Sequence, residues 1–129
     1  MSHFSTIKTQ IKEKPLLIEA LQLLQYDVKE DQTLHVEGTH AIDHPTFDTD
    51  VSITSDIGFR WNKSTNSYEL VTDLETWNQD ITVQRFIDKV TQQYARLTIH
   101  DTVKNLGFEV AEEWEMDDNS IEITVNRWI

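Results

Sequence analysis

The residue types best suited to bind a metal ion are the histidines and the aspartate at His40, Asp43 and His44. Three nitrogen and oxygen ligands with an open coordination position would suit a catalytic zinc or iron ion. Histidines four residues apart share one face only on a helix, however, and Pro45 follows directly. We expect a loop or an edge excursion over residues 39–50, so exposed loop histidines explain this cluster better. The metal site is kept as the alternative interpretation.

Other motifs of catalysis are absent from the sequence. The chain has no cysteine, which leaves no thiolate metal site and no cysteine nucleophile. It has no Gly-x-Ser-x-Gly elbow, and its three glycines cannot form the usual phosphate-binding loops. The adjacent acidic residues Asp117 and Asp118 are interpreted as turn residues. We therefore expect no cofactor, and a non-enzymatic role is favoured over an enzymatic one.

The clearest strand signal lies near the end of the chain, where apolar and acidic side chains alternate. One run covers residues 108–116, a polar turn covers 117–120, and a second run covers 121–126. This pattern predicts two antiparallel strands with one apolar and one acidic face. The simplest interpretation of the acidic face is a solvated surface, partly neutralised by Lys8 and Lys12 on a neighbouring strand. The alternative is a docking surface for a basic protein, formed by Glu109, Glu113, Glu115 and Glu122.

A second set of candidate partner-binding residues is aromatic or basic: Arg60, Trp77 and Trp128. Arg60 lies in an alternating run, 51–61, that predicts one strand with a buried face. A polar loop at 62–67 and a return strand at 68–73 complete a predicted hairpin. The return strand has apolar residues on both faces, which predicts a central position in its sheet. Gly58, in the middle of the run, indicates a bulge or the close approach of another backbone.

Two amphipathic helices must support these strands. A stripe of leucines that follows Pro15 predicts a helix over residues 15–26, since proline suits the first position of a helix. A longer apolar stripe predicts a second helix from 83 to 106, followed by a stop at Gly107. This stripe moves around the helix axis near Thr98, where we expect a kink or a break.

The order of these elements predicts the fold class. Additional strands are predicted at residues 3–12 and 33–37. The predicted fold is α+β, an antiparallel sheet with two helices packed on one face, for which a ferredoxin-like layout is one possibility. A length of 129 residues suits a single α+β domain, 1–129.

The overall charge restricts the class of partner. The formal net charge is −12 and the isoelectric point is about 4.6. Such a surface repels phosphate backbones, so we expect no nucleic acid partner and favour a basic one. No stretch is long and apolar enough to span a bilayer, so we expect no membrane insertion. We find no secretory signal, and the absence of cysteine suits a reducing compartment.

Several separated motifs carry a resemblance to a known family. They are Met1-Ser-His-Phe-Ser-Thr-Ile-Lys-Thr, Asp56-Ile-Gly-Phe-x-Trp-Asn, Tyr68-Glu-Leu-Val-x-Asp-Leu-x-x-Trp77, and Gln93-Tyr-Ala95 leading to Ile99. The chain resembles, over nearly its whole length, the small proteins encoded by hypothetical chloroplast open reading frames of cyanobacteria and red-algal-type plastids. The resemblance implies a cyanobacterial cytoplasm or a plastid stroma, and a link to photosynthesis or plastid maintenance. It implies no reaction.

Two functions of different classes follow. The first is a non-enzymatic protein-binding, assembly or regulatory factor that docks a partner with a basic surface through the acidic strand face. The second is a small enzyme or ligand- or metal-binding protein with a pocket near His40, Asp43 and His44. A contiguous exposed aromatic patch beside the acidic face would favour the first function, and burial of every tryptophan would count against it. A cavity lined by convergent polar groups would favour the second.

Overall fold

The computed structural model describes residues 3–35, 46–118 and 120–127. Within these ranges the chain forms two helices and seven strands. In chain order they are β1 (Ser5–Lys8), α1 (Lys14–Leu23), β2 (Lys29–His35), β3 (Thr46–Thr54), β4 (Ile57–Asn62), β5 (Ser67–Thr72), α2 (Val83–Asn105), β6 (Phe108–Glu115) and β7 (Ile121–Arg127).

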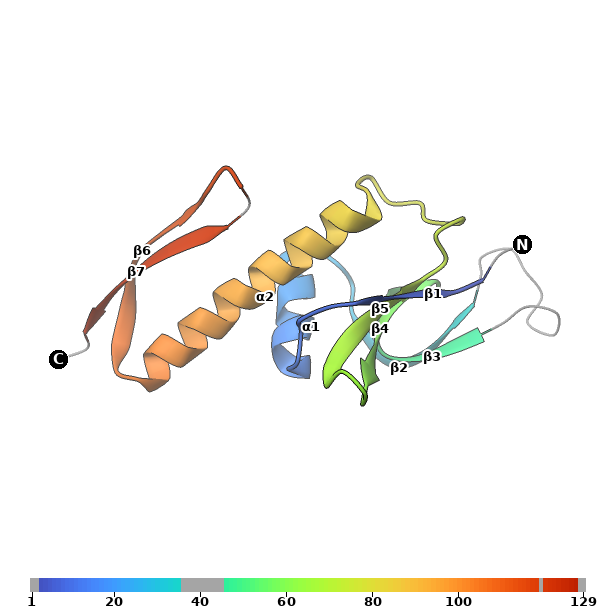
Figure 1. The fold of residues 1–129 in the computed structure, drawn as a ribbon, viewed down its shortest axis with the longest axis horizontal. Helices are drawn as coiled ribbons and strands as arrows, with labels where there is room; N and C mark the ends of the chain where they lie inside the picture. The colour runs from blue at the N-terminus through green and yellow to red at the C-terminus, as the bar shows by residue number, and fades with distance from the viewer. Residues whose placement is uncertain (1–2, 36–45, 119, 128–129) are drawn as a thin grey trace.

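The strands are divided between two antiparallel sheets (Figure 1). One sheet has the order β1-β5-β4-β3-β2, and the other consists of β6 and β7 alone. The predicted α+β class, with two helices and antiparallel sheets, is confirmed. The layout differs from a ferredoxin-like one because α2 connects two separate sheets. Lys8 consequently pairs with Glu69 on β5 and does not neutralise the acidic strands at the end of the chain.

The core lies between the five-stranded sheet and the two helices. Leu17 and Leu21 of α1 and Phe86 and Val90 of α2 pack against fully buried sheet residues, with Phe59 stacked on Phe86 at a centroid distance of 6.3 Å. Complete burial of a large apolar side chain contributes about 1.5–3 kcal/mol. These contacts therefore fix both helices on one face of the sheet.

The single strand predicted over residues 51–61 is wrong. The structure has two strands there, β3 and β4, which are joined by a turn at Ser55 and Asp56. The register shifts between Ser52 and Thr54, so Ile53 is an extra residue on β3. The bulge and the two-residue turn kept the apolar residues on odd-numbered positions from 51 to 61. The alternation therefore looked like that of one continuous strand, although the chain reverses direction.

Two other predictions for this sheet are confirmed. The return strand, β5, lies between β1 and β4, and all six of its residues are buried. Gly58 lies where another backbone comes close: an added Cβ atom would be 2.7 Å from the carbonyl oxygen of Val51. A side chain larger than hydrogen at this position would push β3 and β4 apart.

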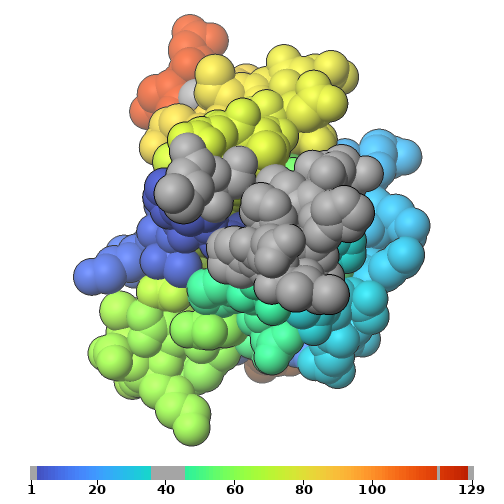
Figure 2. All heavy atoms as spheres, turned by 90° about the vertical axis from the view of Figure 1, so that its right-hand side faces the viewer, coloured from blue at the N-terminus to red at the C-terminus, as the bar shows by residue number. Residues whose placement is uncertain are grey.

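Helix α2 is continuous through Thr98, so the predicted break is wrong. The Thr98 hydroxyl donates a hydrogen bond of 2.9 Å to the Tyr94 carbonyl oxygen within the helix. Beyond Val90 the helix leaves the sheet, and β6 and β7 lie along this second part (Figure 1). Seen along the long axis, the five-stranded sheet fills the near end, and little of β6 and β7 is visible behind α2 (Figure 2). Neither described helix is long and apolar enough to cross a membrane.

A hydroxyl group on α2 holds the start of α1. The Tyr94 hydroxyl oxygen accepts hydrogen bonds from the backbone N–H groups of Lys12 and Glu13, each at 3.1 Å. The side chain of Glu13, at the N-cap position of α1, makes no capping hydrogen bond. Tyr94 therefore supplies a connection between α1 and α2 at the point where α2 leaves the core.

We expect Tyr94→Phe to lower the free energy of unfolding by about 1 kcal/mol, because two backbone donors lose their acceptor. Urea unfolding measures the change, and amide hydrogen exchange should become faster at Lys12 and Glu13. The control is Tyr26→Phe, since no hydrogen bond of the Tyr26 hydroxyl is found within the described ranges. Equal effects of the two substitutions would show that the Tyr94 hydroxyl does not hold α1.

Candidate functional site

The pairing of β6 with β7 contains a bulge that rearranges the acidic residues. Val110 is opposite Val125, but Glu112 is opposite Thr124, so Ala111 is an extra residue on β6. One additional residue exchanges the two faces of a strand for every residue that follows it. The continuous acidic face predicted from the sequence is therefore divided between the two sides of the hairpin, by which we mean residues 108–127.

The outer face of the hairpin, which points away from α2, combines three carboxylates with one tryptophan. Its residues on β6 and β7 are Glu109, Glu112, Trp114 and Glu122. Trp114 lies directly opposite Glu122, and 52% of its surface is exposed. The sequence pattern placed Trp114 on the apolar face, and the bulge is the reason for the difference. Glu109 and Glu122 occupy the outer face as predicted.

Glu113 and Glu115 lie on the opposite, inner face, opposite Ile123 and Ile121 of β7. The Glu113 carboxylate accepts a hydrogen bond from Nε of Arg96 and a second, of 2.9 Å, from Nε2 of His100. Both donors are on α2 and are four residues apart, so they share one face of the helix. Glu113 therefore fastens the hairpin to α2.

The protonation of Glu113 reflects this contact. Burial acts to raise the pKa of its carboxyl group, but the hydrogen bonds from His100 and Arg96 and their charges outweigh burial and lower the pKa below the ordinary value of 4.5. Because the folded-state pKa is depressed, the stabilising contribution of Glu113 is present above pH 4.5. It is lost as the pH falls below 4.5 through the folded-state pKa.

The second part of α2 and the hairpin, residues 91–127, form an extension that we call the arm. No described residue of the arm is buried, although its helix and hairpin both carry apolar stripes. Its most exposed large apolar side chains include Ile99 at 39%, Met116 at 42% and Leu106 at 69%. A two-stranded hairpin has little stability of its own, so this one depends on its contact with α2. The apolar side chains of the arm are only partly covered by that contact.

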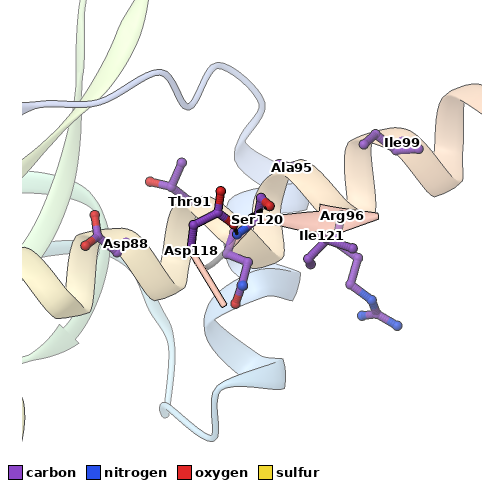
Figure 3. Close-up of a pocket in the computed structure, with 9 residues that line it drawn as sticks. Asp88, Thr91, Ala95, Arg96, Ile99, Asp118, Ser120 and Ile121 are labelled. Carbon is purple, nitrogen blue, oxygen red and sulfur yellow. Dashed lines mark hydrogen bonds between the residues drawn. The ribbon is translucent and has the colours of Figure 1, made fainter. Parts of the chain in front are cut away.

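Two hollows border the hairpin where it meets the helices. The larger, of about 470 Å³, lies between α2 and the start of β7, with Ala95, Ile99 and Ile121 among its lining residues (Figure 3). Asp88 and Asp118 add carboxylates to the same hollow (Figure 3). The smaller hollow, of about 350 Å³, is bounded by α1, α2 and β6.

Arg60 and Trp77 lie outside the arm. The Arg60 guanidinium lies 4.4 Å from the centroid of the Phe47 ring, on the five-stranded sheet. Trp77 packs against Phe86 at 5.5 Å, and its indole N–H donates a hydrogen bond of 2.8 Å to the Ile81 carbonyl oxygen. The structure does not bring these two residues together with the glutamates of the hairpin.

The remaining predicted site residues, His40, Asp43, His44 and Trp128, lie outside the described residues. Among the residues that the structure does describe, no group of three or more histidine, aspartate or glutamate side chains is arranged to hold a metal ion. The predicted pocket near His40, Asp43 and His44 stays a prediction.

Sequence reasoning missed Glu112 on the outer face and the contacts of Arg96 and His100. One signal was present: Glu112 occupies an even-numbered position in a run whose other even-numbered residues, from 108 to 116, are all apolar. Such an interruption is compatible with an inserted residue. The positions of Arg96 and His100, four apart on a predicted helix, were compatible with a shared partner.

Residues 20–124 match the family described as "Protein of unknown function (DUF1257)". The chain is similar to the "Uncharacterized protein ycf35" of Pyropia yezoensis, with 36% identity over 99% of this chain and 98% of the relative. It is similar to the proteins of the same description from Guillardia theta, with 36% identity, and from Cyanophora paradoxa, with 32% identity, over the same shares of both chains. No solved structure matches.

We expect Glu113→Gln to loosen the hairpin from α2 by about 1 kcal/mol, because two charge-assisted hydrogen bonds are weakened at a partly exposed site. Amide hydrogen exchange of residues 108–127 at pH 7, compared with the parent protein, measures the effect. The difference in exchange between the variant and the parent protein should disappear as the pH falls below 4.5, through the lowered pKa of Glu113. Glu113 of the parent protein is then protonated and, like glutamine, carries no charge.

The matched control is Glu112→Gln, which removes a charge of the same sign one residue away on the outer face. It should leave the exchange of the hairpin amides unchanged at both pH values. If both variants increase exchange equally, general charge rather than the contact with Arg96 and His100 holds the hairpin.

Proposed function

Because this chain belongs to the family described as "Protein of unknown function (DUF1257)", we propose a function from its own surface: it is a non-enzymatic factor that docks a basic protein through the arm. The resemblance to the plastid open-reading-frame family is thereby confirmed. The proposal adds a physical role to that membership. It rests on the burial, charge and composition of residues 91–127.

The observation that carries the proposal is the absence of buried side chains among the described residues of the arm. Its apolar stripes are covered on one side only, and Ile99 and Trp114 are each more than one-third exposed. Exposed apolar surface next to polar residues is typical of protein interaction sites. A partner that covers this layer would complete a core that the chain alone leaves unfinished.

The charge of the hairpin selects the class of partner. Residues 108–127 contain one basic residue, Arg127, and seven acidic residues: Glu109, Glu112, Glu113, Glu115, Asp117, Asp118 and Glu122. A second copy of the chain would bring the same acidic surface against itself, which opposes pairing of two arms. A basic surface instead gains from the same charges, which also accelerate its approach at low salt.

Trp114 supplies the central contact of this surface. Tryptophan is frequent among the few residues that carry most of the energy of an interface, and such residues are surrounded by contacts that exclude water. Here the indole ring lies opposite Glu122, with further carboxylates at Glu109 and Glu112 on the same face. The arrangement suits an arginine or lysine of the partner, whose charge can face both the carboxylates and the indole ring.

We propose a plastid stroma or the cytoplasm of a cyanobacterium as the cellular setting. The similarity to the ycf35 proteins of Pyropia yezoensis, Guillardia theta and Cyanophora paradoxa supports this proposal. A basic partner in photosynthesis or plastid maintenance fits this setting. The metal-site alternative involves His40, Asp43 and His44, and no observation on the described residues favours it.

We expect Trp114→Ala to weaken binding of the partner about 30-fold, which corresponds to the loss of a contact of about 2 kcal/mol. The measurement begins with affinity capture from native cell extract at low salt, followed by mass spectrometry. Binding of the identified protein to each variant is then quantified. Binding should also weaken as salt is added, because the attraction is between exposed charges.

A charge-reversed variant and a matched control complete the test. Replacement of Glu109, Glu112 and Glu122 by lysine should abolish capture of the partner. We call the part of the chain outside the arm the body. The same change in charge on the body, at the exposed residues Asp27, Asp48 and Asp80, should leave capture intact. The proposal would be overturned if the parent protein, the charge-reversed variant and the control captured the partner equally. Loss of capture in the control alone would also overturn it.

A further inference from the structure

We propose that the partner binds as an extended strand added to the free edge of β7, and that basic and apolar side chains alternate along this strand. This inference rests on the proposed function and specifies its binding mode. Strand addition supplies affinity through backbone hydrogen bonds, and specificity through alternate side chains. Three properties of β7 support it: an unprotected edge, a hollow with apolar residues in its wall on one side, and a carboxylate on the other.

The edge of β7 differs from the other strand edges of the described sheets. Edge strands are usually protected by shortness, bulges, prolines or lysines. In the five-stranded sheet, β1 has four residues and ends at Lys8, and the pairing of β2 skips Asp31, whose φ is 53°. The free edge of β6 carries the bulge at Ala111.

By contrast, β7 is regular and favourable for pairing. Its sequence, Ile-Glu-Ile-Thr-Val-Asn-Arg, contains no proline, glycine or lysine, and the bulge in its pairing with β6 lies on β6. Isoleucine, valine and threonine are frequent in strands. Within the described residues β7 has β6 as its one neighbour, so its other edge keeps unpaired N–H and C=O groups. These groups can accept another strand.

The inner side of an added strand would meet a hollow that has both apolar and polar residues in its wall. A residue added beside Ile121 would point the same way as Ile121, towards α2, because paired residues share a face. The hollow of about 470 Å³ lies there, with Ala95 and Ile99 on its helical wall (Figure 3). Ile99 is 39% exposed and would be covered. An apolar side chain therefore suits the inner position of the partner strand beside Ile121, next to Ala95 and Ile99.

The outer side of the same strand would meet acidic residues. A partner residue beside Glu122 extends the row formed by Trp114 and Glu122, at a Cβ–Cβ distance of about 5 Å from Glu122. Thr124 is small, so a long side chain beside it can reach towards Glu112 in the next strand. Lysine or arginine suits these outer positions.

The test uses a defined probe, the blocked heptapeptide acetyl-Val-Lys-Val-Lys-Val-Lys-Val-amide, and the intact isotope-labelled protein. We expect the amide signals of residues 121–127, together with those of Ala95 and Ile99, to shift on titration. Hydrogen exchange of the β7 amides should slow at least tenfold when the peptide is bound. Glu122→Lys should weaken binding about tenfold, whereas Asp27→Lys, at an exposed residue that borders neither hollow of the hairpin, should leave it unchanged.

Two control peptides separate strand addition from simple charge attraction. In the first, two adjacent central residues are N-methylated, which removes a donor from each edge of the peptide and keeps every side chain. In the second, glutamate replaces lysine. Both should bind at least tenfold more weakly than the probe.

Three results would overturn strand addition. They are equal binding of the N-methylated peptide, shifts confined to the outer face of β6, and no binding of the probe at millimolar concentration. The proposed function is decided separately, by capture of a protein partner that is lost with Trp114→Ala. A captured partner together with any of the three results means that docking occurs by another geometry.

Discussion

The burial of Phe86 and Val90 against the five-stranded sheet determines the position of everything that follows them in the chain. These two residues are the fully buried part of α2, and they lie in its first eight residues. The remaining 15 residues, from 91 to 105, continue in the same direction because helical hydrogen bonds carry them beyond the core. Among the described residues, the hairpin contacts the rest of the chain chiefly through α2. Its location is thus a consequence of a few apolar contacts near the start of one helix.

The chain consequently combines two regions with different physical support. The body has a close-packed core in which Phe59, Leu70 and the buried face of α1 exclude water. The arm has the polar contact of Glu113 with Arg96 and His100, and an apolar layer that remains partly exposed. Local opening is easiest where buried apolar contacts are few. The region proposed to bind a partner is therefore also the region that can adjust its shape at the lowest cost.

Local patterns in the sequence predicted much of the fold, and their limits have a physical cause. The alternation in residues 108–116 and 121–126 predicted β6, the turn and β7, and apolar residues on both faces predicted the central position of β5. Periodicity reports which residues alternate, but it contains no information on which strand is the neighbour. The separation of β6 and β7 from the other five strands was therefore not predictable in this way. The turn at Ser55 and Asp56 was not predictable either.

The candidate site was only partly predictable for a related reason. Glu109 and Glu122 were identified correctly as outer-face residues, because a regular strand model suffices for them. The extra residue Ala111 exchanges the two faces of β6 for the residues after it. Glu113 therefore faces α2, and Trp114 lies on the surface. The contact between Glu113, Arg96 and His100 joins elements whose relative position depends on tertiary packing. No spacing rule within one element can specify it.

The hydrogen bonds from Lys12 and Glu13 to the Tyr94 hydroxyl give α2 the properties of a lever. The helix continues for about 22 Å beyond Val90, since each residue advances it by about 1.5 Å. A rotation of about 10° around that point would move the distant end by about 4 Å while displacing Tyr94 by about 1 Å. A displacement imposed by a partner at the hairpin is thus transmitted, at about a quarter of its size, to the first residues of α1.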